Sequence, residues 1–318
     1  DRWWTSGDRW CGLVTLNYHR FGDRTSTPCD PGVFSATAEQ FESQIRFLKK
    51  NCDLVSVSDL ADVIRPGNRR RAILLTIDDG YLDNYEVAFP ILRSHGAPAV
   101  IFLATGLIDQ PKVAWWDEIN WIVRRMGGGE LRMPDQWHLE PLGVTEETLN
   151  TVLDRLLRIA KTLPPSQLES LLADLAASSG IGRAPITPET APWMSWDMIR
   201  EMHRAGIEFG GHTVTHPVLA YCPEEQQRQE IFTCKARIEH EIGTTISSFS
   251  YPIGAKTAFT QQTQQLVQQA GYRWAFSFYS GYSRFPTNTF DLRRVPANFE
   301  MSDAEFRMTV SIPRLFAR

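Results

Sequence analysis

The chain has 318 residues, of which 42% are hydrophobic and 22% are charged, a composition typical of a globular protein with room for one large α/β domain. The formal net charge of −4 at pH 7 argues against a nucleic-acid backbone or an anionic membrane as the main partner. No apolar run reaches the roughly eighteen residues that a membrane span needs. The five cysteines are scattered, so neither a disulfide framework nor a cysteine zinc site is predicted.

The start of the chain identifies no compartment. It opens with Asp1-Arg2-Trp3-Trp4 instead of Met or a signal peptide, which predicts a trimmed or processed start. Localisation and oligomeric state therefore stay open.

Strand-like and helix-like segments alternate through the first third of the chain. Short apolar runs predict buried strands, and apolar residues at three- and four-residue spacing predict helices. Such alternation indicates parallel strands joined by crossover helices. The predicted elements are strands at 12–19, 54–57, 72–77 and 99–103, and helices at 38–50, from 58, and at 83–94.

The alternation breaks between residues 113 and 192. We predict a helical insertion at 113–192 within a single domain that spans 1–318, because amphipathic helices follow one another there and no strand-like run separates them. Trp115 and Trp116 could stack on sugar rings, but tryptophans at a helix start more often serve packing. The helices are predicted from about 115, at 145–161 and at 166–177.

The alternation resumes at residue 195, where Ser195 is a good helix N-cap. Counting all strands gives about seven or eight parallel elements, and this number favours a closed or nearly closed β/α barrel over an open sheet. The remaining predicted elements are strands at 207–211, 249–254, 274–278 and 292–295, and helices at 196–205, 223–241, 261–270 and 303–310.

Two adjacent carboxylates, Asp78 and Asp79, end the most apolar of these strands. Neighbouring side chains on an extended chain point in different directions, so each carboxylate can have its own role. His212 and His216 follow another strand, four residues apart. Because chemistry in β/α barrels lies at the carboxyl ends of the strands, these four side chains are expected to meet.

One carboxylate and two imidazoles form a ligand set that suits Zn²⁺, Co²⁺, Ni²⁺ or Fe²⁺. We assign Asp79, His212 and His216 to a divalent metal, with Zn²⁺ expected and Co²⁺ or Ni²⁺ as alternatives. Asp78 would act as general base on a metal-bound water that serves as nucleophile. His19, near the end of the first strand, is the histidine best placed to be the general acid. This combination predicts a hydrolase.

Three short segments, in this order and spacing, resemble the first three motifs of the polysaccharide deacetylase family, also called carbohydrate esterase family 4 or the NodB homology domain. The resemblance covers most of the chain outside the helical insertion. The segments are Thr76-Ile77-Asp78-Asp79-Gly80, His212-Thr213-Val214-Thr215-His216 and Tyr251-Pro252-Ile253-Gly254.

The resemblance implies a distorted (β/α)₇ barrel of the NodB type and the same base and metal ligands. It also implies that the turn formed by Tyr251, Pro252 and Ile253 contacts the substrate and supplies a backbone N–H for the oxyanion.

The sequence departs from the family pattern at three points. Ile77 stands where Phe is usual, a change that a buried strand should tolerate. Ser250 replaces the arginine that orients the base, and Arg294 resembles an arginine that some relatives supply from a later strand. No histidine follows His240, where the family's general acid usually lies, and some relatives use a first-strand Tyr-His sequence like Tyr18-His19 instead.

We therefore expect a metal-dependent hydrolase of carbohydrate metabolism, cleaving carbon–nitrogen bonds other than peptide bonds. Its expected substrate is an N-acetylated glycan, a polysaccharide or oligosaccharide whose hexosamine units lose their acetyl groups. The alternatives are an O-acetyl esterase acting on a glycan and a glycan-binding protein with a decayed catalytic site.

Overall fold

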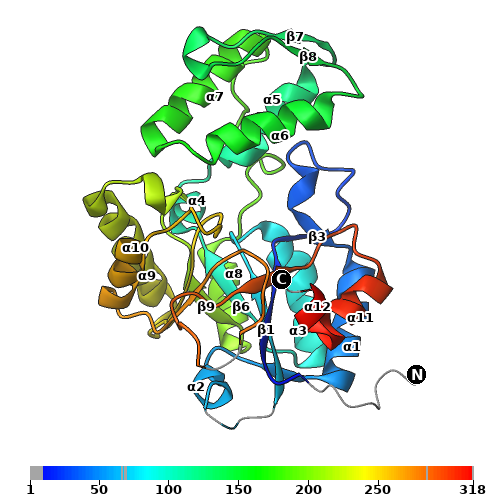
Figure 1. The fold of residues 1–318 in the computed structure, drawn as a ribbon, viewed down its shortest axis with the longest axis vertical. Coiled ribbons are helices and arrows are strands. Elements are labelled where there is room, and N and C mark those ends of the chain that lie inside the picture. Colours follow the sequence, from blue (N-terminus) through cyan, green and yellow to red (C-terminus); the bar gives the residue numbers. More distant parts are fainter. Residues whose placement is uncertain (1–9, 66, 68–69, 284–285, 317–318) are drawn as a thin grey trace.

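The centre of the protein is a barrel of parallel strands (Figure 1). The computed structural model describes residues 10–65, 67, 70–283 and 286–316, so the prediction about the N-terminal residues lies outside the described part. Adjacent strands run parallel at each pairing around the barrel. Their order is β11 (Trp274–Phe276), β10 (Ser248–Ser250), β9 (Glu208–Gly211), β6 (Val100–Leu103), β5 (Arg71–Ile77), β1 (Gly12–Tyr18) and β12 (Arg294–Pro296).

The last strand joins the two edges of this sheet. Arg294 in β12 pairs with Thr15 of β1, and Leu292 just before it forms a parallel bridge with Phe276 of β11. Strand β4 (Asp53–Val55) pairs with the first half of β5, while β6 pairs with the second half. The predicted distorted seven-stranded α/β barrel is thus confirmed as a nearly closed one.

Helices surround the barrel, and four of them begin at a capping box: α1 (Ala38–Asn51), α8 (Trp196–Arg204), α10 (Gln261–Gln269) and α11 (Asp303–Ser311). Thr37 and Gln40 form the capping box at the start of α1, and Ser195 caps α8 as predicted. The other surrounding helices are α2 (Leu60–Val63), α3 (Phe89–His95), α4 (Thr105–Asp109), α9 (Glu224–Ile242) and α12 (Pro313–Phe316).

The helix predicted at 83–94 is not uniform. Its first part, η2 (Asn84–Ala88), has π-helical geometry, and α3 follows directly. Pro90 has no N–H to donate to the preceding turn, which accounts for a widened turn at this point. Other short elements are β2 (Arg20–Phe21), β3 (Phe34–Ala36), η1 (Pro31–Val33), η3 (Asp135–Trp137) and η4 (Leu219–Tyr221).

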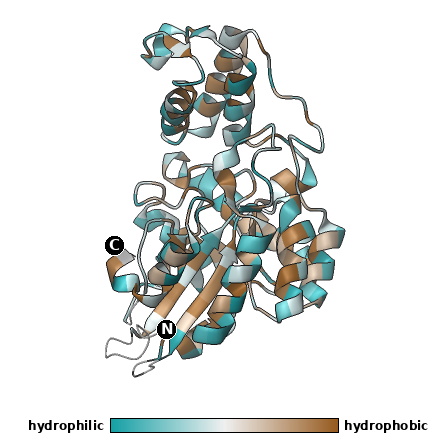
Figure 2. Cartoon of the chain, turned by 90° about the vertical axis from the view of Figure 1, so that its right-hand side faces the viewer, coloured by the Kyte–Doolittle hydropathy of each residue, from teal (hydrophilic) through white to brown (hydrophobic). Residues whose placement is uncertain are grey.

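The segment 113–192 lies at one end of the barrel (Figure 1). Its apolar residues form a separate core, which Tyr81, Ala104 and Leu107 of the barrel part join. Figure 2 shows apolar strands inside the barrel and apolar faces turned inward in this second unit. Its helices are α5 (Trp115–Arg125), α6 (Leu149–Ala160) and α7 (Pro165–Ser179).

The expectation that this segment contains no strand was wrong. Strands β7 (Gly129–Leu131) and β8 (Leu142–Val144) form an antiparallel pair between α5 and α6. Each has only three residues, too few to show a two-residue period, and glycines precede the first of them. Among the described residues, none of the helices is both long and apolar enough to cross a membrane.

Candidate metal centre and active site

The two carboxylates predicted to carry the chemistry lie at the carboxyl end of β5 and face different partners. The backbone of Asp78 still follows the sheet, with its N–H donating to Tyr18 O at 2.9 Å. Asp79 turns the chain, with φ of 78°. As a result the Asp78 side chain contacts Arg294, whereas Asp79 points at the two histidines.

The two histidines lie on a tight turn after β9. His212 continues the sheet through its N–H to Leu103 O, at 3.0 Å. The turn closes where the N–H of His216 donates to the Thr213 hydroxyl at 3.0 Å. The imidazole centroids are 4.7 Å apart, so the turn holds both rings on one side.

A buried carboxylate from α9 holds the middle of this turn. Glu230 accepts the N–H groups of Val214 and Thr215, at 2.7 and 2.8 Å, and the Thr215 hydroxyl at 2.5 Å. Sequence analysis did not find Glu230, because nothing in a polar helix distinguishes it from its charged neighbours.

Backbone strain concentrates at this site. Five non-glycine residues in the described part of the chain have positive φ, and four of them are Asp79, Thr213, His216 and Ile253. Side chains disfavour this conformation, so packing must enforce it, and such strain tends to cluster where function requires a particular geometry.

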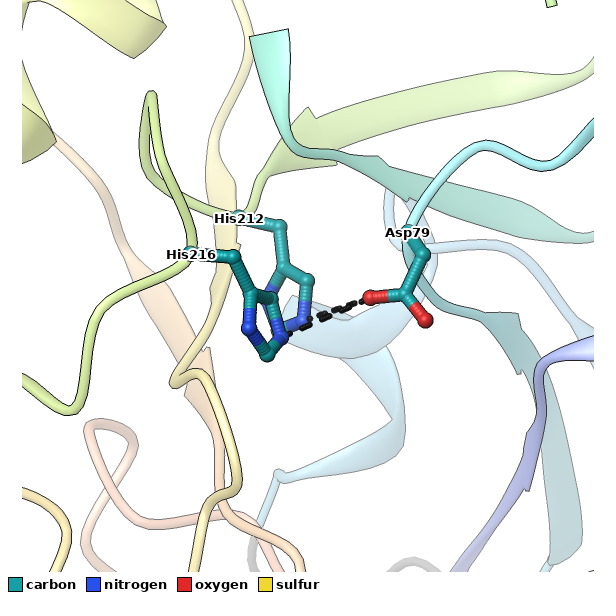
Figure 3. Close-up of side chains that lie close together, drawn as sticks. All are labelled: Asp79, His212 and His216. Atoms are coloured by element: carbon teal, nitrogen blue, oxygen red, sulfur yellow. Dashed lines mark ion pairs between the residues drawn. The ribbon is translucent and has the colours of Figure 1, made fainter. Parts of the chain in front are cut away.

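Asp79, His212 and His216 form a cluster whose potential ligand atoms all lie within 4.8 Å of one another (Figure 3). The Oδ1 atom of Asp79 is 3.5 Å from Nε2 of both histidines. This oxygen is buried and has no hydrogen-bond partner among the described residues. An unsatisfied buried carboxylate oxygen facing two imidazoles fits a divalent cation, which would satisfy all three.

The tautomer of His212 supports the same interpretation. Its Nδ1 lies 2.7 Å from the carbonyl oxygen of Ser250, which can only accept, so Nδ1 carries the hydrogen. In the neutral ring Nε2 then offers a lone pair toward Asp79. The residues present therefore fit a metal of the kind predicted from the sequence.

The charge states within the cluster are those that metal binding requires, an ionised carboxylate and a neutral imidazole. Burial raises the pKa of Asp79, but His212 and His216 outweigh it and keep the carboxyl ionised. Burial and His212 lower the pKa of His216 to about 3, so this ring is neutral at pH 7. Burial lowers the pKa of His212, but Asp78 and Asp79 outweigh that effect and raise it, so protons compete with a metal at that ring.

Arg294 lies on β12, which is separated from β5 by β1 alone, and its side chain is only 1% exposed. Its Nη1 donates to Asp78 Oδ1 at 2.8 Å, and its Nη2 to the Ser250 hydroxyl at 2.9 Å. Burial raises the pKa of Asp78, but Arg294 and His212 outweigh it and hold the pKa well below its usual value. Asp78 is therefore ionised at neutral pH.

Two polar residues that sequence analysis did not assign complete this network. Asn17 accepts from Arg294 at 2.5 Å, and the Ser250 hydroxyl lies 3.3 Å from Asp78 Oδ2. Asn17 shares a face of its strand with His19, two residues on, and this two-residue spacing was the available signal.

His19 lies at the mouth of the same pocket. Its Nε2 is 4.0 Å from Asp78 Oδ2, and its side chain is 25% exposed. Burial lowers its pKa although Asp79 and Asp78 oppose this, so the neutral imidazole predominates. The structure thus brings His19 beside the carboxylate pair.

The third motif forms a turn at the pocket wall. The Tyr251 N–H already donates to Phe276 O at 3.1 Å, and Pro252 has no N–H. Ile253 lines the pocket with φ of 62°, and its N–H makes no backbone hydrogen bond within the described residues. Of the three predicted residues, Ile253 is thus the one with an amide free to face a substrate.

These residues share one pocket of about 360 Å³. The barrel supplies its base, with His19, the two carboxylates and the histidines, and the segment 113–192 supplies one wall, which includes Trp115 and Trp116. Both tryptophans are below 9% exposed, so they pack against the protein as well as line the pocket.

Comparison with known proteins gives this geometry a context. The sequence model of the family described as Polysaccharide deacetylase matches residues 65–130 and 175–275, more than half of the chain. The chain belongs to the polysaccharide deacetylase family. Membership in this NodB-type family indicates a deacetylase, that is, a hydrolase, and the family as a whole uses a divalent metal.

Individual members of the deacetylase family resemble the chain to different extents. YxkH of Bacillus subtilis (strain 168) is 20% identical over 95% of this chain and 77% of its own. The poly-β-1,6-N-acetyl-D-glucosamine N-deacetylase of Escherichia coli (strain K12) is 29% identical, but over only 34% of this chain and 16% of its own. Streptococcus pyogenes deacetylase PplD, solved with acetate, has a TM-score of 0.61 at 16% identity and covers 94% of this chain and 98% of its own.

Proposed function

We propose that this protein is a metal-dependent deacetylase that removes acetyl groups from N-acetylated hexosamine units of a polysaccharide or oligosaccharide. One observation carries the proposal: Asp79, His212 and His216 form a potential metal site beside the ionised Asp78, in one pocket. The named substrate of the Escherichia coli relative, poly-β-1,6-N-acetyl-D-glucosamine, supports an N-acetylated glycan as the substrate class.

Each residue has a separate role in this proposal. Asp79, His212 and His216 would hold the cation, with Zn²⁺ expected and Co²⁺ or Ni²⁺ as alternatives. When bound, the cation supplies Lewis acidity and lowers the pKa of a water molecule. Asp78 takes a proton from the attacking water, and Arg294 keeps Asp78 oriented and ionised.

The proton and bond changes balance. Water oxygen bonds to the acetamide carbonyl carbon while Asp78 accepts its proton, and the Ile253 N–H stabilises the oxygen that becomes negative. That proton passes from Asp78 to the neutral His19 imidazole, whose Nε2 lies 4.0 Å from Asp78 Oδ2. The C–N bond then breaks as the protonated His19 gives the same proton to the amine nitrogen. Acetate and a free hexosamine amine are the products.

We also propose that 1–318 is one catalytic domain and that 113–192 is an insertion shaping its substrate groove. Support comes from the family match, which omits residues 131–174, and from the apolar core within the segment. Asp154 and Leu157 of α6, and Lys161 directly after it, line the pocket and support the same role.

The test is acetate release from a panel of N-acetylated and O-acetylated glycans. Chelator-treated protein is assayed before and after Zn²⁺, Co²⁺ or Ni²⁺ is added. We expect release from an N-acetylhexosamine substrate only after metal is restored. Release from O-acetyl esters alone would make the protein an esterase, and glycan binding without any release would favour the binding-only alternative.

A further inference from the structure

His216 differs from His212 in how its ring is held. A metal-binding histidine usually donates its second ring N–H to a carbonyl or carboxylate, which fixes the ring orientation. His212 does this with Ser250 O. Nδ1 of His216 is buried and has no hydrogen-bond partner among the described residues. Ring packing must therefore orient this imidazole.

The packing partner comes from the segment 113–192. The Trp116 ring lies edge-on to His216 with centroids 4.6 Å apart, and only 7% of Trp116 is exposed. The indole is itself held, because its Nε1–H donates to the Tyr81 hydroxyl at 2.8 Å. Tyr81 follows Asp79 by two residues and stacks on Trp193, with ring centroids 4.4 Å apart.

Asp117 completes this chain of contacts. It is fully buried and accepts the Tyr81 hydroxyl at 2.8 Å and the Asp30 N–H at 2.9 Å. Asp30 lines the catalytic pocket as well. The Asp117 carboxylate thus holds two groups: the Tyr81 hydroxyl, which in turn binds Trp116, and the backbone of the pocket wall at Asp30.

Burying an ionised carboxylate at the position of Asp117 costs folding free energy. Burial raises the pKa of Asp117 to about 7, although the Arg20 guanidinium, which lies over the Tyr81 ring at 4.7 Å, opposes this. Buried titratable groups with shifted pKa values gather at functional sites, in agreement with a role beyond packing.

We propose that Asp117 is a positioning residue: through the Tyr81 hydroxyl it holds the Trp116 indole against His216, and so sets the orientation of a metal ligand from outside the barrel. This role rests on the proposed function, because it assumes that His216 binds a metal. It also gives the segment 113–192 a task at the reacting centre beyond shaping the groove.

The test compares Asp117→Asn, Tyr81→Phe and their double variant. Asn keeps the size of Asp117. Its single carbonyl oxygen can replace only one of the two carboxylate oxygens, which accept hydrogen bonds from the Tyr81 hydroxyl and the Asp30 N–H. Phe removes the hydroxyl that joins Asp117 to Trp116 while keeping the ring on Trp193. We expect each single variant to weaken Zn²⁺ binding by the metal-free protein about tenfold, as changes outside the ligand set do elsewhere. The double variant should bind Zn²⁺ no more weakly than the weaker-binding single variant, because both residues act through the same chain of contacts.

Glu118→Gln is the matched control. Glu118 is the next residue of α5 and is also buried, but it accepts a hydrogen bond from Arg183 at 2.5 Å, and within the described residues its side-chain hydrogen bonds stay inside the segment 113–192. Replacing the Glu118 carboxylate by an amide should lower the melting temperature and leave the Zn²⁺ dissociation constant unchanged.

Two results would overturn the role of Asp117. One is a lower melting temperature in Asp117→Asn and Tyr81→Phe with an unchanged Zn²⁺ dissociation constant, which would make the network purely structural. The other is an equal weakening of Zn²⁺ binding in Glu118→Gln, which would make the effect a general destabilisation. If Asp117→Asn fails to fold, Tyr81→Phe still decides.

The metal titration needs no substrate, so it separates this role from the proposed function. Wild-type protein that binds Zn²⁺ but releases no acetate would refute the deacetylase proposal. The Zn²⁺ titration of the variants would still test the positioning role of Asp117. With an active enzyme, kcat/KM should fall in parallel with metal occupancy and recover at high Zn²⁺ concentration.

Discussion

Replacing Arg294 by Met should destabilise the protein strongly. The guanidinium makes five hydrogen bonds, to Ser277 O, Asn17, Thr76, Asp78 and Ser250. The side chain is 1% exposed, and Met leaves the buried Asp78 carboxylate without the guanidinium that neutralises its charge. Removing one member of a buried ion pair costs about 3–5 kcal/mol.

Urea unfolding of the metal-free protein at neutral pH measures this loss. With a denaturant slope of roughly 3 kcal/mol per molar, the midpoint should fall by about 1 M or more. The variant Asp78→Asn/Arg294→Met removes the unpaired charge as well as the cation. We therefore expect the double variant to be more stable than Arg294→Met alone, although it carries one more substitution.

Arg293→Met is the control for this experiment. Arg293 is the adjacent residue and is exposed, so its replacement should change stability by no more than about 0.5 kcal/mol. A double variant as unstable as Arg294→Met, or less stable, would refute the idea that the unpaired Asp78 charge causes the loss.

Three further changes test the proposed roles. Asp78→Asn should slow turnover by about 10²–10⁴-fold, as loss of a general base does, while the metal content measured after dialysis stays intact; activity like the wild type would rule out Asp78 as the base. His212→Ala should lose the bound metal, and a full equivalent retained after dialysis would remove His212 from the ligand set. His19→Ala should slow release of an amine far more than release of a good alcohol leaving group, and an equal loss with both would contradict its role as general acid.

The carboxylates and histidines could be found from the sequence because their signals are local. Asp78 and Asp79 end an apolar run, and His212 and His216 follow a strand at close spacing. In a parallel barrel the carboxyl ends of the strands converge, so local signals at these ends predict a common site. The same rule placed His19 near the site.

Other parts of the site leave no local signal. Arg294 could be linked to Asp78 only through family resemblance, because 216 residues separate them along the chain. Ser250 was interpreted as a missing arginine, whereas its hydroxyl contacts both Arg294 and Asp78. Such contacts depend on which strands become neighbours when the barrel closes.

The sequence alone thus predicted the fold class, the order of the barrel strands and the polar residues at the strand ends, since apolar periodicity and short motifs express these directly. Tertiary structure decided how the segment 113–192 meets the barrel, and with it the place of Trp116 beside His216 and of Asp117 behind Tyr81. In the sequence, Trp116 and Asp117 belong to an ordinary amphipathic helix. Only the packing of that helix over the barrel mouth brings them to the site, because contacts between distant segments arise from the fold as a whole.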